Sequence, residues 1–153
     1  MKRRIFFAGL LLLVASAFAN AAEKPEAKPS TPAATTTNAP SVQVIAYYFH
    51  GTVRCEKCQK IERMAREVIE QRFKPEMTAK RLLFKPLNYD LPENAHFLQA
   101  YKLPCPSLVL VRRQAGKDEK WKLLGETWQL VEDATKFNRY VLDEVEKLLR
   151  VPN

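Results

Sequence analysis

Two cysteines separated by two residues lie in the stretch Arg54-Cys55-Glu56-Lys57-Cys58. The apolar run from Val42 to His50 precedes them, and its β-branched and aromatic residues predict a strand buried on both faces. Gly51-Thr52 then predict a turn, and apolar residues recur beyond Cys58 at helical spacing. These are Ile61, Met64, Ala65, Val68 and Ile69. The stretch therefore predicts a strand, a tight loop and a helix that begins at the cysteine pair.

This placement predicts redox chemistry. Two cysteines three positions apart at a helix start lie on one face, close enough to bond each other. The unpaired N–H groups and the dipole at that helix end favour a thiolate on Cys55. We expect Cys55 to be the nucleophile of thiol–disulfide exchange and Cys58 to resolve the mixed disulfide. A structural disulfide is the alternative, but so small a loop removes little chain entropy.

The residues around the pair have opposing effects on the Cys55 thiolate. Arg54 and Lys57 favour it, whereas Glu56 opposes it. Oxidant, reductant and isomerase roles therefore all stay open.

The 153-residue chain begins with the three parts of a secretory signal. Lys2-Arg3-Arg4 precede an apolar segment, Ile5 to Phe18, and A-x-A sites follow. That segment is shorter than the ~20 residues that span a bilayer, which argues against an uncleaved anchor. We expect a signal peptide over residues 1–19 with cleavage near 19–21, a Pro/Ala/Thr-rich linker over 20–41 and one domain over 42–150. The predicted location is the periplasm, with no stable membrane span after cleavage.

The chain carries a formal net charge of +8, three units of which come from the signal segment. The other cations are interleaved with acidic residues, as on a solvated surface, and we predict no nucleic-acid partner. The sequence contains no G-x-G-x-x-G, no Walker lysine loop and no H-E-x-x-H.

The remaining patterns predict the order β-α-β-α-β-β-α. Helices are predicted from Cys55 to about Phe73, over residues 91–101 with Pro92 at the first helical position, and over the C-terminal segment. Further strands are predicted over 81–88, 107–112 and 121–124, the last two forming a hairpin. Strands separated by helices are expected to pair in parallel through right-handed crossovers, with the hairpin adding an antiparallel strand. The fold class is α/β, with a mixed sheet between helices.

Two motifs resemble the thioredoxin-like superfamily. The first is Cys55-Glu56-Lys57-Cys58 after the first strand. The second is the segment from Leu87-Asn88-Tyr89-Asp90 to Pro104-Cys105-Pro106-Ser107. The resemblance covers residues 42–150 and implies a three-layer sandwich with helices on both faces of a mixed sheet. It also implies a cis-proline at Pro106 beside the cysteine pair, where a substrate strand docks.

The chain departs from the thioredoxin pattern at several positions. Arg54 precedes the first cysteine in place of tryptophan, and Glu56-Lys57 replace Gly-Pro. Phe49 occupies the position of a buried aspartate that serves the second cysteine, and Pro86 replaces the accompanying lysine. General-base help would therefore come from His50 or Glu56.

The resemblance also implies that Cys105 packs against the C-x-x-C pair. Three converging sulfurs could form a redox set, or a soft site for Cu(I), or for Zn(II) with His50 as fourth ligand; Cys105 could equally be a small packed residue. The predicted function is a periplasmic thiol–disulfide oxidoreductase. Its partners would be protein or small-molecule thiols and disulfides, with an unknown redox partner and no cofactor beyond the Cys55–Cys58 disulfide. The alternative is a thioredoxin-like Cu(I)- or Zn-binding or interaction module, with Cys55, Cys58 and Cys105 as ligands and little turnover.

Overall fold

The structure is a computed structural model that describes residues 42–150. The predicted signal peptide (1–19) and linker (20–41) lie outside the described residues. Within the described range no helix combines the length and the apolar character needed to cross a membrane.

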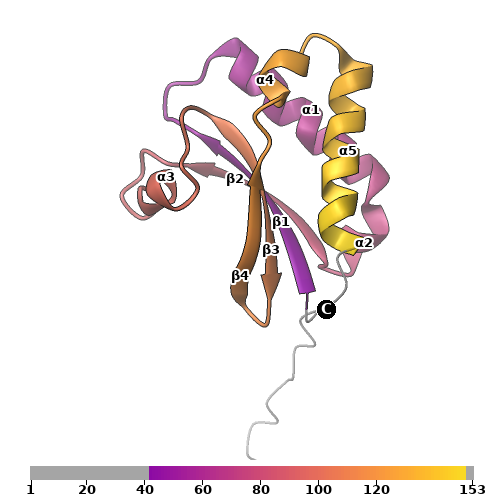
Figure 1. The fold of residues 1–153 in the computed structure, drawn as a ribbon. Coiled ribbons are helices and arrows are strands. Elements are labelled where there is room, and N and C mark those ends of the chain that lie inside the picture. Colours follow the sequence, from indigo (N-terminus) through magenta and orange to yellow (C-terminus); the bar gives the residue numbers. More distant parts are fainter. Residues whose placement is uncertain (1–41, 151–153) are drawn as a thin grey trace, which may run out of the picture. The chain divides into compact units, whose positions relative to one another are not determined.

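A four-stranded sheet forms the centre of the fold (Figure 1). It contains β1 (Val42–His50), β2 (Leu82–Asn88), β3 (Ser107–Gln114) and β4 (Lys117–Leu123), in the order β2-β1-β3-β4. β1 pairs in parallel with β2 and antiparallel with β3, and β3 pairs antiparallel with β4. The sheet is mixed, as predicted.

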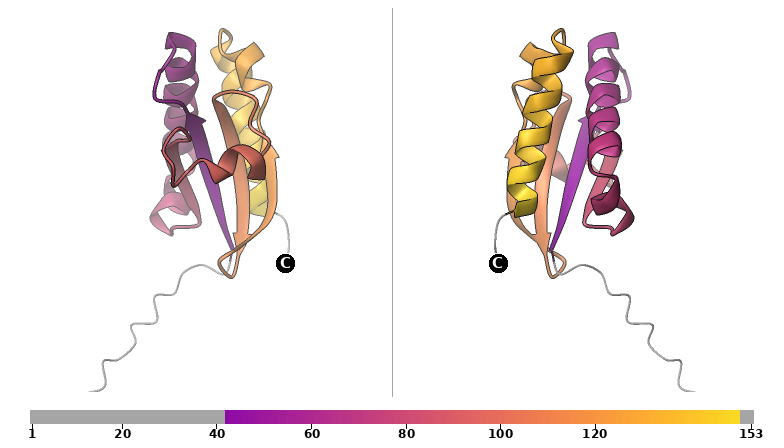
Figure 2. Two further views of the ribbon diagram at one scale, coloured as in Figure 1. Left: turned by 90° about the vertical axis from the view of Figure 1, so that its left-hand side faces the viewer. Right: turned by 90° about the vertical axis from the view of Figure 1, so that its right-hand side faces the viewer.

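Helices cover both faces of the sheet (Figure 2). The long helices α1 (Glu56–Arg72) and α5 (Ala134–Arg150) lie side by side on one face, and the short α3 (His96–Ala100) lies on the other. Two further short helices, α2 (Lys74–Thr78) and α4 (Thr127–Leu130), were not predicted from the sequence. The thioredoxin-like three-layer α/β arrangement is confirmed.

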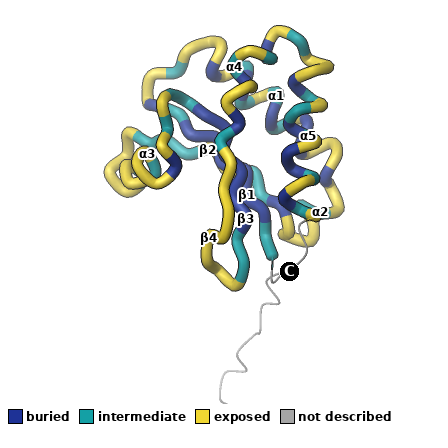
Figure 3. Tube along the Cα trace, in the orientation of Figure 1, coloured by how far each residue is buried: buried dark blue, intermediate teal, exposed yellow. Residues whose placement is uncertain are grey.

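The alternation of side chains along β1 divides the core into two clusters. Val44, Ala46 and Tyr48 belong to the cluster beneath α1 and α5. Ile45, Tyr47 and Phe49 belong to the cluster on the α3 side. Residues 44–49 are all buried, which explains the continuous apolar run, whereas β4 is mostly exposed (Figure 3). The alternation also points Tyr48 towards α1 and the cysteine pair.

Parallel pairing through helical crossovers holds for β1 and β2 but is wrong for β3. The five residues of α3 rise only about 7.5 Å, far less than a seven-residue strand spans. The segment after β2 therefore does not carry the chain back along the sheet. β3 starts at the end where β2 finishes and runs antiparallel to β1.

The helix expected over residues 91–101 is also shorter than predicted, because α3 begins only at His96. Side chains before it bind nearby backbone groups instead. Asn88 Oδ1 accepts the Asp90 N–H at 3.0 Å, and Asn94 Nδ2 donates to Asn88 O at 2.9 Å. Such local bonds compete with helix formation, and Pro92 does not open a helix.

The hairpin between β3 and β4 is tighter than predicted. Its two loop residues, Ala115 and Gly116, have φ of 48° and 79°. Positive φ at both central residues is typical of the two-residue turn whose twist matches the flanking strands. β4 therefore begins at Lys117, four residues before the predicted start.

Candidate active site

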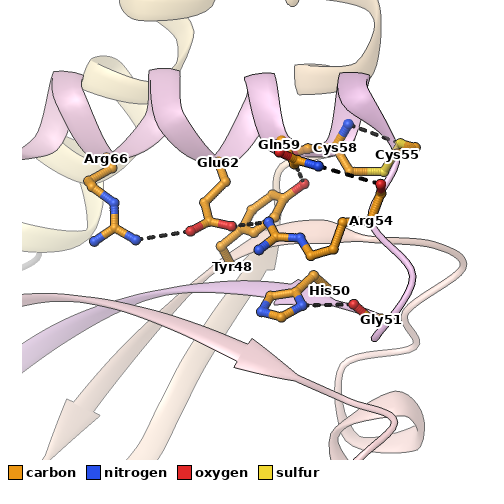
Figure 4. A network of polar contacts seen from close by, with 9 residues as sticks. All are labelled: Tyr48, His50, Gly51, Arg54, Cys55, Cys58, Gln59, Glu62 and Arg66. Atoms are coloured by element: carbon orange, nitrogen blue, oxygen red, sulfur yellow. Dashed lines mark hydrogen bonds and ion pairs between the residues drawn. A yellow bond between two sulfur atoms is a disulfide. The ribbon is translucent and has the colours of Figure 1, made fainter.

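Cys55 and Cys58 are joined by a disulfide at the N-terminus of α1, with their Cα atoms 5.1 Å apart (Figure 4). Cys55 is the N-cap residue, with extended backbone. Its sulfur accepts the N–H of Cys58 at 3.0 Å, and its carbonyl accepts the N–H of Gln59 at 3.0 Å. The first cysteine sulfur thus occupies the place of a capping oxygen, where N–H groups and the helix dipole stabilise negative charge.

The two sulfurs differ in accessibility. Cys55 is exposed, whereas only 4% of Cys58 is accessible. An external thiol or disulfide therefore reaches Cys55, and Cys58 can react only with a group already bound to its neighbour. The roles of Cys55 as nucleophile and of Cys58 as resolving thiol stay predictions.

Tyr48, on β1, forms a hydrogen bond with the backbone of the second cysteine. Its hydroxyl donates a 2.6 Å hydrogen bond to the carbonyl oxygen of Cys58, and its side chain is fully buried. Burial raises the pKa of Tyr48 well above its ordinary value, so the hydroxyl keeps its proton and remains a donor. The sequence pattern predicts only a core position for Tyr48, because nothing in an apolar run marks one tyrosine as a partner of a distant carbonyl.

An ion-pair network lies beside the cysteines. Glu62 on α1 accepts hydrogen bonds from Arg54, which precedes Cys55, and from Arg66 at 2.9 Å (Figure 4). Burial alone would raise the pKa of Glu62, but the hydrogen bonds from both arginines lower it below its usual range. Glu62 was not predicted from the sequence as part of the site. Its spacing of four from Arg66 was the available signal, but the contact with Arg54 depends on the turn before α1.

The loop between β1 and α1 is held by residues that follow β2. Thr52 N–H donates to Asp90 Oδ2 at 2.7 Å. A Cβ added at Gly51 would come within 3.1 Å of that same oxygen, so glycine permits the close approach. His50 Nδ1 lies 2.9 Å from Gly51 O. A proton-accepting role for His50 or for Glu56, which is exposed in the first turn of α1, stays a prediction.

Trp128 links the segment before β3 to the first turn of α1. Its Nε1 donates to Pro106 O at 2.9 Å, and Lys57 Nζ lies 5.9 Å from its ring centroid. No site was predicted at Trp128, because α4, which carries it, was not expected from the sequence. The cis peptide bond before Pro106 and its docking role stay predictions.

Cys105 is a free, partly buried thiol. Its carbonyl accepts the Ser107 hydroxyl at 2.7 Å, and its sulfur lies 4.0 Å from that same oxygen. A position of the Cys105 sulfur beside the Cys55–Cys58 pair stays a prediction.

Over residues 42–150, no group of three or more His, Cys, Asp or Glu side chains is arranged to hold a metal ion. Cys55 and Cys58 use their sulfurs in the disulfide. A site formed by these two with Cys105 would need the reduced pair and stays a prediction.

Comparisons with known proteins give likenesses among solved structures. No protein-family model and no curated protein matches the chain. Among solved structures it is similar to Trxlp from Edwardsiella tarda EIB202, with 17% identity, 67% of this chain and 84% of that chain covered, and a TM-score of 0.41. It is also similar to a thioredoxin from Thermus thermophilus, with 20% identity, 65% and 74% covered, and a TM-score of 0.36. The protein is thioredoxin-like in fold. That assignment follows from the strand order and helix placement described above.

Proposed function

We propose that the protein is an exported thiol–disulfide oxidoreductase of the periplasm that acts through Cys55 and Cys58. The observation that carries the proposal is the asymmetry of the pair. An exposed sulfur caps a helix N-terminus, and a buried sulfur is bonded to it three residues later. A purely structural disulfide needs no such difference in access.

The exchange proceeds in two balanced steps. The Cys55 thiolate attacks one sulfur of a substrate disulfide, forms a mixed disulfide and expels the other substrate sulfur as a thiolate, which takes up a proton. Cys58 then loses its proton, attacks the Cys55 sulfur and expels the second substrate thiolate. The substrate gains two electrons and the pair becomes the disulfide. The same steps in reverse oxidise a substrate dithiol.

Export is supported by the N-terminal segment, in which a basic start, an apolar run and A-x-A sites succeed one another. Disulfides persist in oxidising compartments such as the periplasm. Cell fractionation with N-terminal sequencing of the mature protein tests this part, and a cytoplasmic, unprocessed chain would contradict it.

Enzymatic turnover is tested with insulin reduction followed by turbidity, in the presence of dithiothreitol. The parent protein should accelerate precipitation, and Cys55→Ser should abolish the acceleration. In a separate reaction from which dithiothreitol has been removed, pre-reduced Cys58→Ser should accumulate a mixed disulfide with insulin through Cys55, detectable as a mass adduct. Turnover that survives in Cys55→Ser would contradict the assignment.

A further inference from the structure

We propose that an arginine-lined hollow beside the disulfide binds acidic side chains of a polypeptide substrate whose cysteine reacts with Cys55. The inference rests on the proposed function and names its substrate class. The hollow measures about 220 Å³ and is lined by Arg54, Gln59, Glu62, Arg63 and Arg66. We call it the arginine hollow.

The arginine hollow follows one face of α1 away from the cysteines. Four of its five residues recur at helical spacing, and the fifth, Arg54, immediately precedes Cys55. Figure 4 shows Arg54, Glu62 and Arg66 in a row that begins at the disulfide. Arg66 packs its guanidinium over the Phe84 ring, 4.7 Å from the centroid, which holds it on the β2 side. A chain bonded to Cys55 therefore has this row within reach.

The arginine hollow carries an excess of positive charge. Its lining contains three guanidinium groups and a single carboxylate, that of Glu62. This carboxylate accepts hydrogen bonds from both Arg54 and Arg66. Glu70 adds a half-exposed carboxylate 3.9 Å from Arg66. Arg63 is exposed, and none of the ion pairs formed by Glu62 and Glu70 within residues 42–150 includes it. An incoming carboxylate would meet donors that the protein's own acids do not fully occupy.

A second hollow near the pair has no such excess. It measures about 290 Å³, lies on another face of α1, and is lined by Glu56, Lys57, Lys60 and Glu132. Two cations there face two acids, and Lys60 Nζ lies 2.6 Å from Glu132 Oε2. Lys57 lies over the Trp128 ring. The charges balance, so an anionic substrate group is drawn to the arginine hollow.

The length of the arginine hollow favours a polypeptide over a small acidic thiol. Arg63 and Arg66 follow the N-cap residue Cys55 by eight and eleven positions. At 1.5 Å per residue this is about 12 and 16 Å along the helix. A small thiol with a carboxylate a few bonds from its sulfur does not span that distance, but four or five extended residues, at about 3.3–3.6 Å each, do.

The test measures how fast single-cysteine peptides reduce the oxidised protein. One peptide carries glutamate four and five residues from its cysteine on both sides, and the matched peptide carries glutamine there. Each rate is divided by that peptide's rate with a neutral small disulfide, which removes differences in thiol pKa. Rates are measured at 0.01 M and 1 M salt, where the Debye length is about 30 Å and 3 Å. The variants are Arg63→Gln, and Arg72→Gln as a control with the same charge change at the far end of α1.

The glutamate peptide should react about two- to fivefold faster than the glutamine peptide at low salt, the size expected of exposed charge pairs. The preference should vanish at 1 M salt, fall by about half in Arg63→Gln and persist in Arg72→Gln. Equal normalised rates for the two peptides, or an equal loss in both variants, would overturn the inference while leaving the proposed function intact. The peptide assignment also fails if 3-mercaptopropionate shows the same preference over mercaptoethanol. Failure of every thiol to reduce the pair would instead refute the proposed function.

Discussion

At the residue scale, the two cysteines have the same chemistry and different surroundings. Cys55 is the exposed N-cap residue, and its sulfur accepts a hydrogen bond from a backbone N–H. Cys58 is buried, and its carbonyl oxygen accepts a hydrogen bond from the Tyr48 hydroxyl. A thiolate is stabilised by N–H donors at a helix start and destabilised by apolar burial. These surroundings predict that Cys55 attacks first.

Reduced protein should accordingly be alkylated at Cys55 first. With sub-stoichiometric iodoacetamide near neutral pH, we expect at least about a tenfold preference for Cys55 over Cys58, because only the first sulfur is both accessible and stabilised as a thiolate. Peptide mapping by mass spectrometry measures the ratio, with denatured protein as the control. Preferential labelling of Cys58 would reverse the two roles.

The carboxylate of Glu62 pairs with the guanidinium group of Arg54, the residue before Cys55. Replacement by glutamine leaves two arginines without their shared carboxylate, and we expect Glu62→Gln to lower the free energy of unfolding at pH 7 by about 1–3 kcal/mol. The folded state lowers the pKa of Glu62. Its contribution is therefore present above the unfolded pKa, near 4.5, and is lost as pH falls through the folded value.

Urea unfolding of parent and Glu62→Gln from pH 7 to pH 3 measures this dependence. The difference between the two proteins should shrink below about pH 4.5. Glu67→Gln, an exposed position on the same helix, serves as the control and should change stability by less than about 0.5 kcal/mol. A difference that grows towards acid pH would contradict the sign of the shift.

At the element scale, the start of α1 is supported by three separate parts of the chain. The residues after β2 hold the preceding loop through Asp90, Tyr48 of β1 holds Cys58, and Trp128 of α4 joins Lys57 to Pro106. Each contact is a single hydrogen bond or ring contact. Together they hold the cysteine pair next to the start of β3.

The hydrogen bond from Trp128 to Pro106 can be removed while an aromatic ring still fills the space of the Trp128 side chain. Trp128→Phe keeps an aromatic ring but loses the donor to Pro106 O, and we expect a loss of about 1 kcal/mol of unfolding free energy. Denaturant unfolding measures it. Trp121→Phe is the matched control, because Trp121 is 39% exposed and meets Tyr101 edge to face; it should cost less than about 0.5 kcal/mol. Equal losses in both variants would mean that the hydrogen bond contributes nothing measurable.

At the scale of the whole molecule, the disulfide lies outside the packed core. The two clusters of buried side chains lie on opposite faces of the sheet, and neither includes Cys55 or Cys58. The bond spans a sequence separation of only three. A disulfide outside the packed core can be reduced without removing any of the contacts within the two clusters.

Reduction should therefore leave the protein folded. We expect an unchanged far-UV circular dichroism spectrum and a cooperative urea transition, with a stability change of about 2 kcal/mol at most, the chain-entropy value for so small a loop. Spectra and transitions with and without dithiothreitol measure this. The double variant Cys55→Ser/Cys58→Ser, which cannot form the bond, controls for effects of the reagent. An unfolded reduced protein would show that the disulfide is structural.

Local patterns in the sequence were enough to predict the frame of the molecule. The buried central strand, the helix that begins at Cys55 and the amphipathic C-terminal helix appear where apolar periodicity indicated them. These elements are set by the spacing of apolar side chains, which is a property of neighbouring residues. The cysteine pair at a helix start could be predicted for the same reason.

Tertiary structure alone decided the direction of β3 and the surroundings of the cysteines. The direction of β3 depended on how far α3 could carry the chain, and α3 was shortened by side-chain bonds from Asn88 and Asn94. Tyr48, Glu62 and Trp128 reach the site from three different elements. Their contacts span 10, 8 and 22 residues, beyond what local periodicity reports. Local sequence was therefore enough to place the cysteine pair at the start of a helix, whereas its surroundings depend on contacts between elements that are distant in the chain.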